Sequence, residues 1–283
     1  MAIQNSINTN PGSFVALRTL NSVNRNLDTT QNRVSTGLKV AGALDDASNF
    51  AIAQGIRGEL KAIGAVTQGL NNAKGIGKVA LAGVTGLSNL LSNVRSKLTE
   101  LSNEGITTQQ RDILTNDFNA LISQANNFLD NAVFNGVNLL DTAAVSTSVN
   151  TLSNLNGGTL TLTAQDLRTT VGDLQGLTPT DAATAQDALS NTASGGTAEF
   201  TNLESVINTA LGSLGAEVRA LELQTQFLEQ ISDATEEGLG NIVDADLARE
   251  SARLTSLQVQ QQLSTQTLGI ANQRPQSLLG LFR

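Results

Sequence analysis

The sequence predicts a mainly α protein: an elongated antiparallel helical bundle, or coiled-coil rod, with a small β-containing outer insert. Three observations lead to this fold class. Apolar residues recur at alternating three- and four-residue spacing over long stretches, as in helices that pack side by side. The three prolines, at positions 11, 179 and 275, leave 12–178 and 180–274 without a helix breaker. Aromatic residues make up only 3% of the chain, which suits thin helical bundles better than large globular cores.

The two ends of the chain are alike in being amphipathic and almost uncharged. Residues 1–24 contain a single charged side chain, Arg18, and residues 254–283 contain only Arg274 and Arg283. Such ends have too little apolar surface to form a globule of their own. We therefore expect them to become buried against each other and against other copies of the chain. The N-terminal end carries an unbroken heptad seam, in which polar residues would set register and partner number: Leu17, Leu20, Asn24, Leu27, Gln31, Val34 and Leu38.

Three further helices are predicted between these ends. A nearly continuous helix from about Asp45 to Asn103 would be roughly 85 Å long. The next helix is entered through Thr107, which has capping-box spacing to Gln110. The three helices carry, in order, the heptad runs Val84, Leu87, Leu91, Val94, Leu98 and Leu101; then Leu114, Phe118, Leu121, Ala125, Phe128 and Ala132; then Leu203, Ile207, Ala210, Leu214, Val218, Leu221, Leu228 and Ile231.

Residues 142–200 have a different pattern. The stretch 159–163 alternates Thr and Leu, as a half-buried strand does. Just before this region, Asn135-Gly136 is a hairpin-turn signal. Because the segment is polar, we expect it on the outside. The predicted division is 1–40 as an N-terminal arm, 41–141 as the first part of a rod domain, 142–200 as the insert, 201–241 as the second part of the rod, and 242–283 as a C-terminal arm.

The composition excludes several function classes. With no Cys and no His, the chain has no disulfide, no zinc site of the ordinary type and no Ser-His-Asp triad. A net charge of −8 argues against nucleic-acid binding. No apolar run approaches the length that crosses a bilayer, and the N-terminus lacks the pattern of a cleaved signal peptide. We expect no enzyme activity, no cofactor, no nucleic-acid partner and no membrane insertion.

The remaining local motifs have structural interpretations. Asp45-Asp46 is interpreted as a helix N-terminus, where negative charge is favoured. Gly75 to Ala80 matches a GxGxxA dinucleotide pattern, but it lies inside a helical run with no strand before it. Glu236-Glu237, Asp244 and Asp246 are interpreted as solvated charges near helix ends. Periodicity alone favours a monomeric and an assembling bundle equally, and the charge-poor arms favour assembly.

Four motifs resemble bacterial flagellins. The stretch from Arg33 to Val40, followed by Asp45-Asp46-Ala47 and Ala51-Ile52-Ala53, is similar to the family's RLSSGxRI…DDAAGxAI pattern. Asp244 to Ser251 resembles the region that leads into the last helix. Phe134-Asn135-Gly136 resembles a QFNG-type turn, and residues 271–276 resemble an ANQxPQ tail. The resemblance covers 1–141 and 200–283, and its motif residues are Arg33, Gly37, Asp45, Asp46, Glu250, Ser251, Asn272, Gln273, Pro275 and Gln276.

The resemblance implies a structural subunit that self-assembles into the extracellular flagellar filament used for motility. It further implies unfolded export through the flagellar type III apparatus with an uncleaved signal. The implied partners are other subunits, a secretion chaperone, the filament cap and hook-junction proteins. In this family the terminal helices pair and line the filament channel. We expect the inner-core assembly interface to comprise Leu17, Leu20, Asn24, Leu27, Gln31, Val34, Leu254, Leu257, Leu263, Leu268 and Ile270.

Three alternative functions compete with this interpretation. A hook–filament junction protein, which shares flagellin-like termini, would join or cap and would not polymerise indefinitely. A filament-borne metallopeptidase requires HExxH, and this chain has no His. A chemoreceptor-type coiled coil would need a transmembrane segment or a cytosolic docking motif, which the sequence does not show.

One stretch departs from the family pattern. Flagellins detected by the vertebrate innate receptor carry R-V-R-E-L-A on the rod helix. The matching stretch here runs from Asn93 to Leu98, with Asn in place of the first Arg and Ser96-Lys97 in place of Glu-Leu, while Arg95 is kept. Because a few residues carry most of an interface's binding energy, we expect this chain to be a poor agonist.

Overall fold

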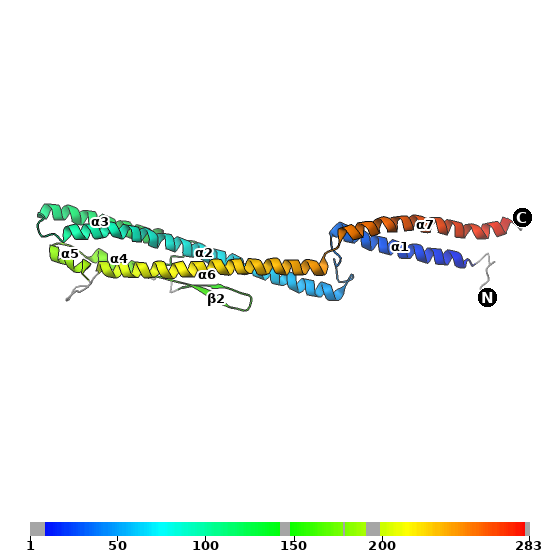
Figure 1. Ribbon diagram of the computed structural model, residues 1–283, viewed down its shortest axis with the longest axis horizontal. Helices are drawn as coiled ribbons and strands as arrows, with labels where there is room; N and C mark the ends of the chain where they lie inside the picture. The colour runs from blue at the N-terminus through cyan, green and yellow to red at the C-terminus, as the bar shows by residue number, and fades with distance from the viewer. Residues whose placement is uncertain (1–8, 142–147, 178, 191–198, 281–283) are drawn as a thin grey trace. The chain divides into compact units, whose positions relative to one another are not determined.

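The structure is a computed structural model that describes residues 9–141, 148–177, 179–190 and 199–280, with the side chains of 274–280 outside the description. The described residues form seven helices and two strands (Figure 1), so the predicted mainly α fold with a small β element is confirmed. They divide into two compact units, 1–60 with 233–283, and 61–232. The elements are α1 (Pro11–Thr36), α2 (Ala47–Leu101), α3 (Thr108–Asn131), β1 (Ser148–Leu152), β2 (Thr159–Thr163), α4 (Leu167–Gly176), α5 (Ala182–Leu189), α6 (Glu199–Val243) and α7 (Leu247–Gly280).

The second unit is an antiparallel bundle built on α2. Contacts step along α2 in one direction and back along α6, from the Lys78–Glu222 ion pair to the Arg95–Glu204 ion pair. The contacts of α2 with α3 run the same way, since Gly86 lies against Phe128 and Lys97 pairs with Asp117. All members of the predicted run from Val84 to Leu101 are buried in one core. Those from Leu203 to Leu228 are buried in the same core except Val218, which is buried beside Gly77. The heptad pattern therefore located these buried faces correctly.

The glycines of α2 are packing residues. A Cβ atom added at Gly77 would lie 2.6 Å from Val218 Cγ2, and one added at Gly75 would lie 2.8 Å from the Phe134 ring. Both glycines lie inside helix α2, as expected, so the GxGxxA pattern reflects close packing against this helix. These contacts explain why a helix of 55 residues tolerates residues that weaken it locally.

The described residues of the segment 142–200 contribute side chains to the core, although the polar composition of this segment predicted an outside position. Strand β2 coincides with the predicted alternation, and it pairs antiparallel with β1. The sequence placed this segment outside, yet two short helices that were not predicted, α4 and α5, also form here. Within the described residues the segment buries the following side chains in the common core: Leu162, Leu167, Val171, Leu174, Ala185 and Ala188.

Local signals fix the helix starts and turns. Thr107 and Gln110 form the predicted capping box at the start of α3. Asp46 accepts hydrogen bonds from the backbone N–H groups of Asn49 and Ser48 at 3.0 and 3.1 Å, which confirms the helix N-terminus expected there. These bonds, with the Asn49 bond the largest cause, hold the pKa of Asp46 below its ordinary value. Asn135 and Gly136, both at positive φ, make the predicted two-residue turn between Phe134 and Val137.

Candidate assembly interface

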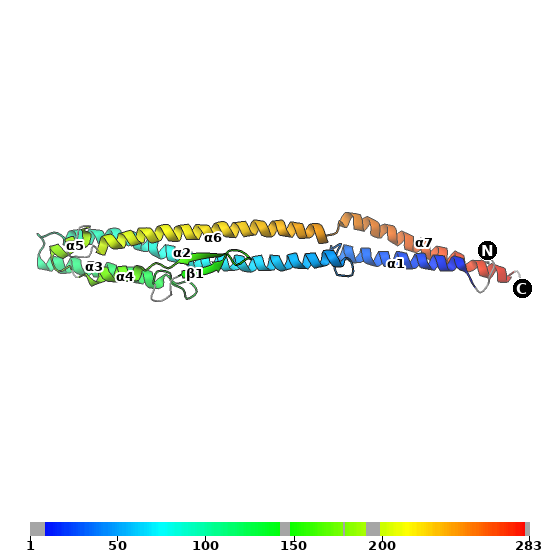
Figure 2. The ribbon, with the colours of Figure 1, turned by 90° about the horizontal axis from the view of Figure 1, so that it is seen from below.

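The terminal helices α1 and α7 lie side by side in the first unit (Figures 1 and 2). Within the described part of the two helices and their caps, three polar contacts cross between them. Asn10 Nδ2 donates to the Ala271 carbonyl at 2.7 Å, Gln261 Nε2 donates to Asn24 Oδ1 at 2.9 Å, and Arg33 pairs with Glu250 at 3.3 Å. Residue numbers rise along α1 as they fall along α7, so the pair is antiparallel.

The seam between the two helices follows strict heptad spacing on both sides. On α1 the inward positions alternate between buried and half-buried residues. On α7 the sequence of inward positions begins at Glu250, which is only 9% exposed. The inward residues are Ala16, Leu20, Val23, Leu27, Thr30 and Val34 on α1, and Glu250, Leu254, Leu257, Gln261, Ser264, Leu268 and Ala271 on α7.

The structure brings some of the expected interface residues into this seam and leaves others outside it. Leu20, Leu27, Val34, Leu254, Leu257 and Leu268 face the partner helix, and half-buried Asn24 lies at its edge. Sequence reasoning missed Ala16, Val23 and Thr30, which occupy the alternate seam positions one residue before Leu17, Asn24 and Gln31. The signal was present, because the spacing from Ala16 is equally regular, but Leu17 is the larger apolar residue.

The expected residues outside the seam form part of an outward apolar stripe on each helix. Leu17 is 45% exposed, and on α7 Leu263 and Ile270 are 55% and 67% exposed. Val259 on α7 and Phe14 on α1 extend these stripes, each more than half exposed. Gln31 is also exposed. A helix with apolar residues on two faces has room for a partner on each, and only one face of each terminal helix is covered by the other.

Several family-motif residues lie at the joint between the end of α1 and the start of α7, formed by residues 37–46 and 243–246. Gly37 ends α1 with φ of 73°, a left-handed conformation that favours glycine. The backbone N–H of Ala245 donates to the Gly37 carbonyl at 2.9 Å, and that of Lys39 donates to the Val243 carbonyl at 2.7 Å. Asp45 accepts from the N–H groups of Ala41 and Gly42, which holds the loop after α1 in shape.

Val40, Ala53 and Val243 form a small separate core at this joint. Arg33 lies in the last turn of α1 and Glu250 in the first turn of α7. Ser251, Asn272 and Gln273 are exposed on α7, whereas the side chains of Pro275 and Gln276 lie outside the described residues.

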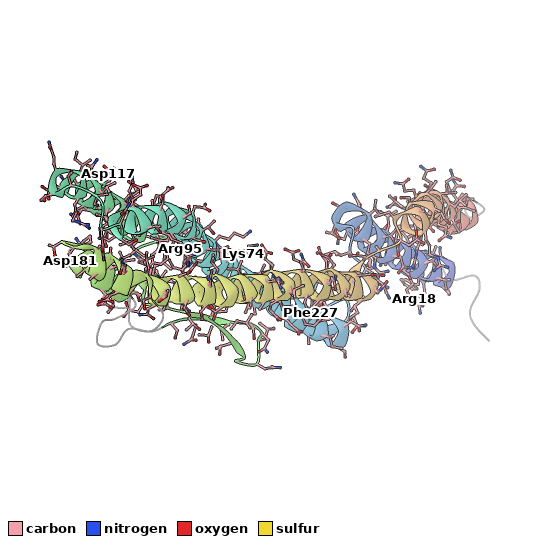
Figure 3. The ribbon with its side chains drawn as sticks, turned by 60° about the vertical axis from the view of Figure 1, so that its left-hand side comes forward. Arg18, Lys74, Arg95, Asp117, Asp181 and Phe227 are labelled. Carbon is pink, nitrogen blue, oxygen red and sulfur yellow. The ribbon has the colours of Figure 1, made fainter. Side chains whose placement is uncertain are left out.

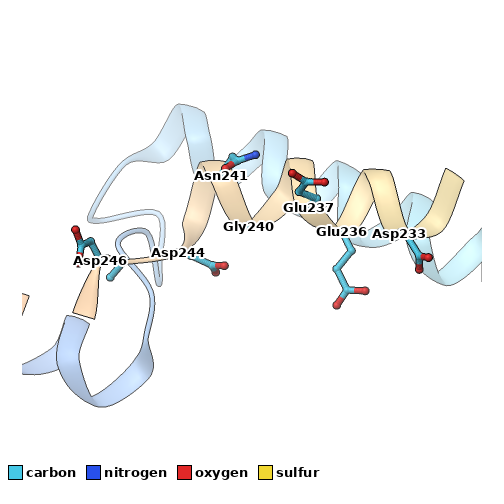
Figure 4. A pocket seen from close by; sticks show the side chains of 8 residues that line it. Asp233, Glu236, Glu237, Gly240, Asn241, Asp244 and Asp246 are labelled. Atoms are coloured by element: carbon cyan, nitrogen blue, oxygen red, sulfur yellow. The ribbon is translucent and has the colours of Figure 1, made fainter. Parts of the chain in front are cut away.

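An acidic groove of about 640 Å³ lies at the C-terminal end of α6. It is lined by carboxylates of the stretch Asp233–Asp246, which point in different directions and do not converge (Figure 4). Asp246 accepts the backbone N–H of Arg249 at 3.1 Å at the start of α7. Among the described residues no group of three potential ligands could hold a metal ion. The interpretation as solvated charges near helix ends fits this geometry.

The stretch that departs from the receptor-binding pattern lies on α2. Val94 and Leu98 are in the core, whereas Asn93, Arg95 and Ser96 are exposed. Arg95 (Figure 3) pairs with Glu204 at 3.6 Å and lies over the Phe200 ring. Lys97 is half-buried between Glu100 and Asp117, at 3.1 and 3.5 Å. The hydrogen bond to Glu100, as the largest cause, raises the pKa of Lys97.

None of the described helices combines the length and the apolar character that a membrane span requires. In the described residues, each terminal helix has an exposed apolar stripe outside the seam, and the seam itself contains polar residues.

Comparison with known proteins gives consistent matches at both ends of the chain. The bacterial flagellin N-terminal helical region matches residues 7–145, and the bacterial flagellin C-terminal helical region matches residues 200–282. Flagellin FljM of Caulobacter vibrioides is 37% identical over 282 residues, which covers 99% of each chain. A flagellin of Brucella melitensis is 36% identical over 292 residues, which covers 98% of this chain and 99% of that protein.

Among solved structures, a putative flagellar hook-associated protein from Vibrio parahaemolyticus has a TM-score of 0.55 and 13% identity. The likeness covers 71% of this chain and 100% of that one. At this identity the likeness concerns the fold alone.

Proposed function

The chain belongs to the bacterial flagellin family and is a structural subunit of the flagellar filament, and we propose that its assembly interface is the outward face of the paired helices α1 and α7. The observation that carries the proposal is the apolar stripe of Leu263 and Ile270 on α7, which the antiparallel partner leaves exposed. A second stripe through Phe14 and Leu17 on α1 offers a complementary surface on another copy. The hook-junction alternative is not favoured, because curated flagellins match this chain end to end.

In this proposal the seam pairs the two arms of one chain and the outward stripes join that pair to neighbouring copies. The interface then includes Leu17, Leu263 and Ile270 through contacts between chains, and Leu20, Leu27 and Leu257 through contacts within one chain. Ordering a chain segment costs about 1–2 kcal/mol per residue in backbone entropy. Burial of the outward stripes on addition to a filament end offsets part of that cost.

The proposal includes export and three kinds of accessory partner. Secretion in an unfolded state through the flagellar type III apparatus is supported by a chain that has no Cys and therefore forms no disulfide in transit. Charge-poor arms with exposed apolar residues, such as Phe14 and Ile270, are surfaces that a secretion chaperone would cover before export. The filament cap and the hook-junction proteins would contact the same arms at the two ends of the filament.

Substitution of the outward stripe tests the interface. Leu263→Gln with Ile270→Gln keeps the seam between α1 and α7 but removes apolar contacts worth about 1.5–3 kcal/mol for each fully buried side chain. In seeded polymerisation we expect the critical concentration to rise by at least about tenfold. Leu263→Met with Ile270→Met keeps the apolar surface and should polymerise close to wild type. Equal critical concentrations for the Gln and Met variants would show that this stripe is not an assembly contact.

We also propose that the chain is a weak agonist of the vertebrate flagellin receptor. Asn93 and Ser96 replace charged side chains of the recognised pattern, and the retained Arg95 is engaged by Glu204 and Phe200. Lys97 stands where the pattern has Leu and is held by Glu100 and Asp117. In a receptor-reporter assay with monomeric protein we expect potency at least about tenfold below that of a strongly agonistic flagellin. The triple variant Asn93→Arg, Ser96→Glu and Lys97→Leu, which restores R-V-R-E-L at 93–97, should regain potency. Equal potency of wild type and this variant would contradict the proposal.

A further inference from the structure

The partly buried ion pair Arg33–Glu250 makes only one hydrogen bond. Arg33 donates from one terminal nitrogen to Glu250 Oε1 at 3.3 Å. Arg33 Nε and Glu250 Oε2 are buried without a hydrogen-bond partner among the described residues. The two side chains are 27% and 11% exposed. A buried ion pair with unsatisfied atoms contributes little net stability, because desolvation offsets the attraction. Its presence in the seam therefore needs another explanation.

The apolar seam by itself does not define how α1 and α7 align. In the observed register Leu27 is level with Leu257, and Ala16 is level with Leu268. If α7 slipped by one heptad, about 10 Å along its axis, Leu20 would become level with Leu257 and Val23 with Leu254. Large apolar residues would meet again, so burial of apolar surface discriminates weakly between the two registers.

The charged pair does discriminate. After the same slip Glu250 would be level with Leu27, and its carboxylate would be buried against an apolar side chain with no cation beside it. A buried charge deprived of its partner is strongly destabilising, even where the intact pair adds little. The same slip would also separate Asn24 from Gln261, which are joined at 2.9 Å in the observed register. Polar residues at single seam positions are known to set register at a cost in stability.

We infer that Arg33 and Glu250 are the register-determining residues of the arm pair. They exclude the slipped alignment that the apolar seam would tolerate, and so they fix where the outward stripes of α1 and α7 stand relative to each other. The inference rests on the proposed function, because the alignment of those stripes matters for packing against other copies. A competing determinant is present at the joint, where backbone hydrogen bonds link Ala245 to Gly37 and Lys39 to Val243.

Disulfide trapping measures the register directly, because the chain has no Cys of its own. Ser13→Cys with Ala271→Cys reports the observed register, in which these positions are level. Ser13→Cys with Ser264→Cys reports the register slipped by one heptad. Each reporter pair is placed in four full-length backgrounds: wild type, Arg33→Leu with Glu250→Leu, the charge swap Arg33→Glu with Glu250→Arg, and Lys78→Leu with Glu222→Leu. The last removes an exposed ion pair of the other unit and is the matched control.

Oxidation is carried out on seeded filaments and on soluble chain separately, and intrachain crosslinks are quantified by mass spectrometry. Wild type and the control should give the observed-register crosslink almost alone. The Leu-Leu background should raise the ratio of slipped to observed crosslink by about tenfold or more, and the charge swap should largely restore the wild-type ratio.

The inference is overturned if the Leu-Leu background keeps the wild-type ratio, because the backbone joint then sets the register without the charged pair. It is also overturned if wild-type filaments give both crosslinks in equal amounts. If no filament forms, equal amounts of both crosslinks in the soluble wild-type chain overturn it. Failure of wild type to extend competent seeds would contradict the proposed function, and the crosslink ratios of the soluble chain would still decide the question of register.

Discussion

At the scale of single residues, the glycines of α2 determine how closely neighbouring segments pack against this helix. Gly77 and Gly83 leave space that Val218, Leu140 and Ala132 fill, since a Cβ at either glycine would lie under 3 Å from one of them. Gly64 lies on the same helix with no atom within 4 Å of the corresponding position. The helix therefore carries glycines that packing requires and at least one that packing does not require.

Replacement of glycine by alanine should therefore change stability in opposite directions at Gly77 and Gly64. Gly77→Ala should lower the free energy of unfolding by about 1–3 kcal/mol, because the added methyl group overpacks the contact with Val218. Gly64→Ala should raise it by up to about 1 kcal/mol, because alanine is the better helix former and nothing opposes it. Urea unfolding of the full chain, followed by circular dichroism, measures both. Stabilisation by Gly77→Ala would contradict the close contact.

Heptad spacing does not decide which face of α1 packs against α7. Ala16 and Leu17 begin equally regular heptads, so spacing alone leaves the seam of α1 ambiguous by one position. The larger side chain suggested Leu17, but Leu17 is 45% exposed and Ala16 is buried. Small residues suit this seam because opposite positions such as Leu268 supply the bulk. That complementarity belongs to the pairing of α1 with α7 and is absent from either segment alone.

At the scale of elements, long helices with dense apolar periodicity were predictable and short polar ones were not. The run from Val84 to Leu101 places six apolar residues at heptad spacing, and Thr107 with Gln110 supplies an explicit start signal for α3. Helices α4 and α5 have 10 and 8 residues, few of them bulky. Their start signals were present, since Asp166 and Asp181 cap them, but two turns of helix give too little periodicity to outweigh a Thr-rich composition.

Ion pairs between elements of the second unit give a pH dependence. Lys78 donates to Glu222 at 2.9 Å between α2 and α6. This hydrogen bond, as the largest cause, holds the pKa of the Glu222 carboxyl below its ordinary value. A carboxyl with a lowered folded-state pKa adds stability that is complete above its unfolded-state pKa and is lost as the pH falls through the folded-state value.

The thermal midpoint of wild type should therefore exceed that of Glu222→Gln near neutral pH, and the gap should close as the pH falls from about 6 to about 3. The effect is small because the pair is exposed to solvent. Glu229→Gln, an exposed position on α6 with no ion pair among the described residues, is the control and should show no such trend. A gap that stays constant or widens toward acid would show that Lys78 does not stabilise the ionised carboxylate.

At the scale of the whole chain, the two units differ in how completely each buries its own apolar residues. The second unit buries a continuous core of its own, with Leu70, Phe118 and Phe200 almost fully enclosed. The terminal pair α1–α7 has a thin seam with polar positions and leaves apolar residues such as Ile270 in solvent. One unit buries its apolar core within the chain, whereas the other leaves apolar surface exposed. This combination suits a subunit whose terminal helices complete their burial only at the growing end of a filament.

The composition along the chain indicated this contrast. Because charged residues are scarce at both ends, the sequence predicted that the end segments become buried against other copies of the chain. The sequence could not place the outward stripe, because inward and outward apolar positions on α7 differ only in which ones α1 covers. Leu257 and Leu263 look equivalent in the sequence, yet one is buried and the other is 55% exposed.

Seeded polymerisation of purified chain, with sedimentation and negative-stain electron microscopy, tests the central claim most directly. The full chain is compared with a variant that lacks residues 1–35 and 250–283 and therefore lacks most of the α1–α7 pair. The account predicts long filaments from the full chain alone, while the shortened variant stays soluble on the same seeds and keeps the circular dichroism of a folded helical bundle. Filaments from the shortened variant, or a full chain that stays soluble on competent seeds, would contradict the claim that the charge-poor arms drive assembly.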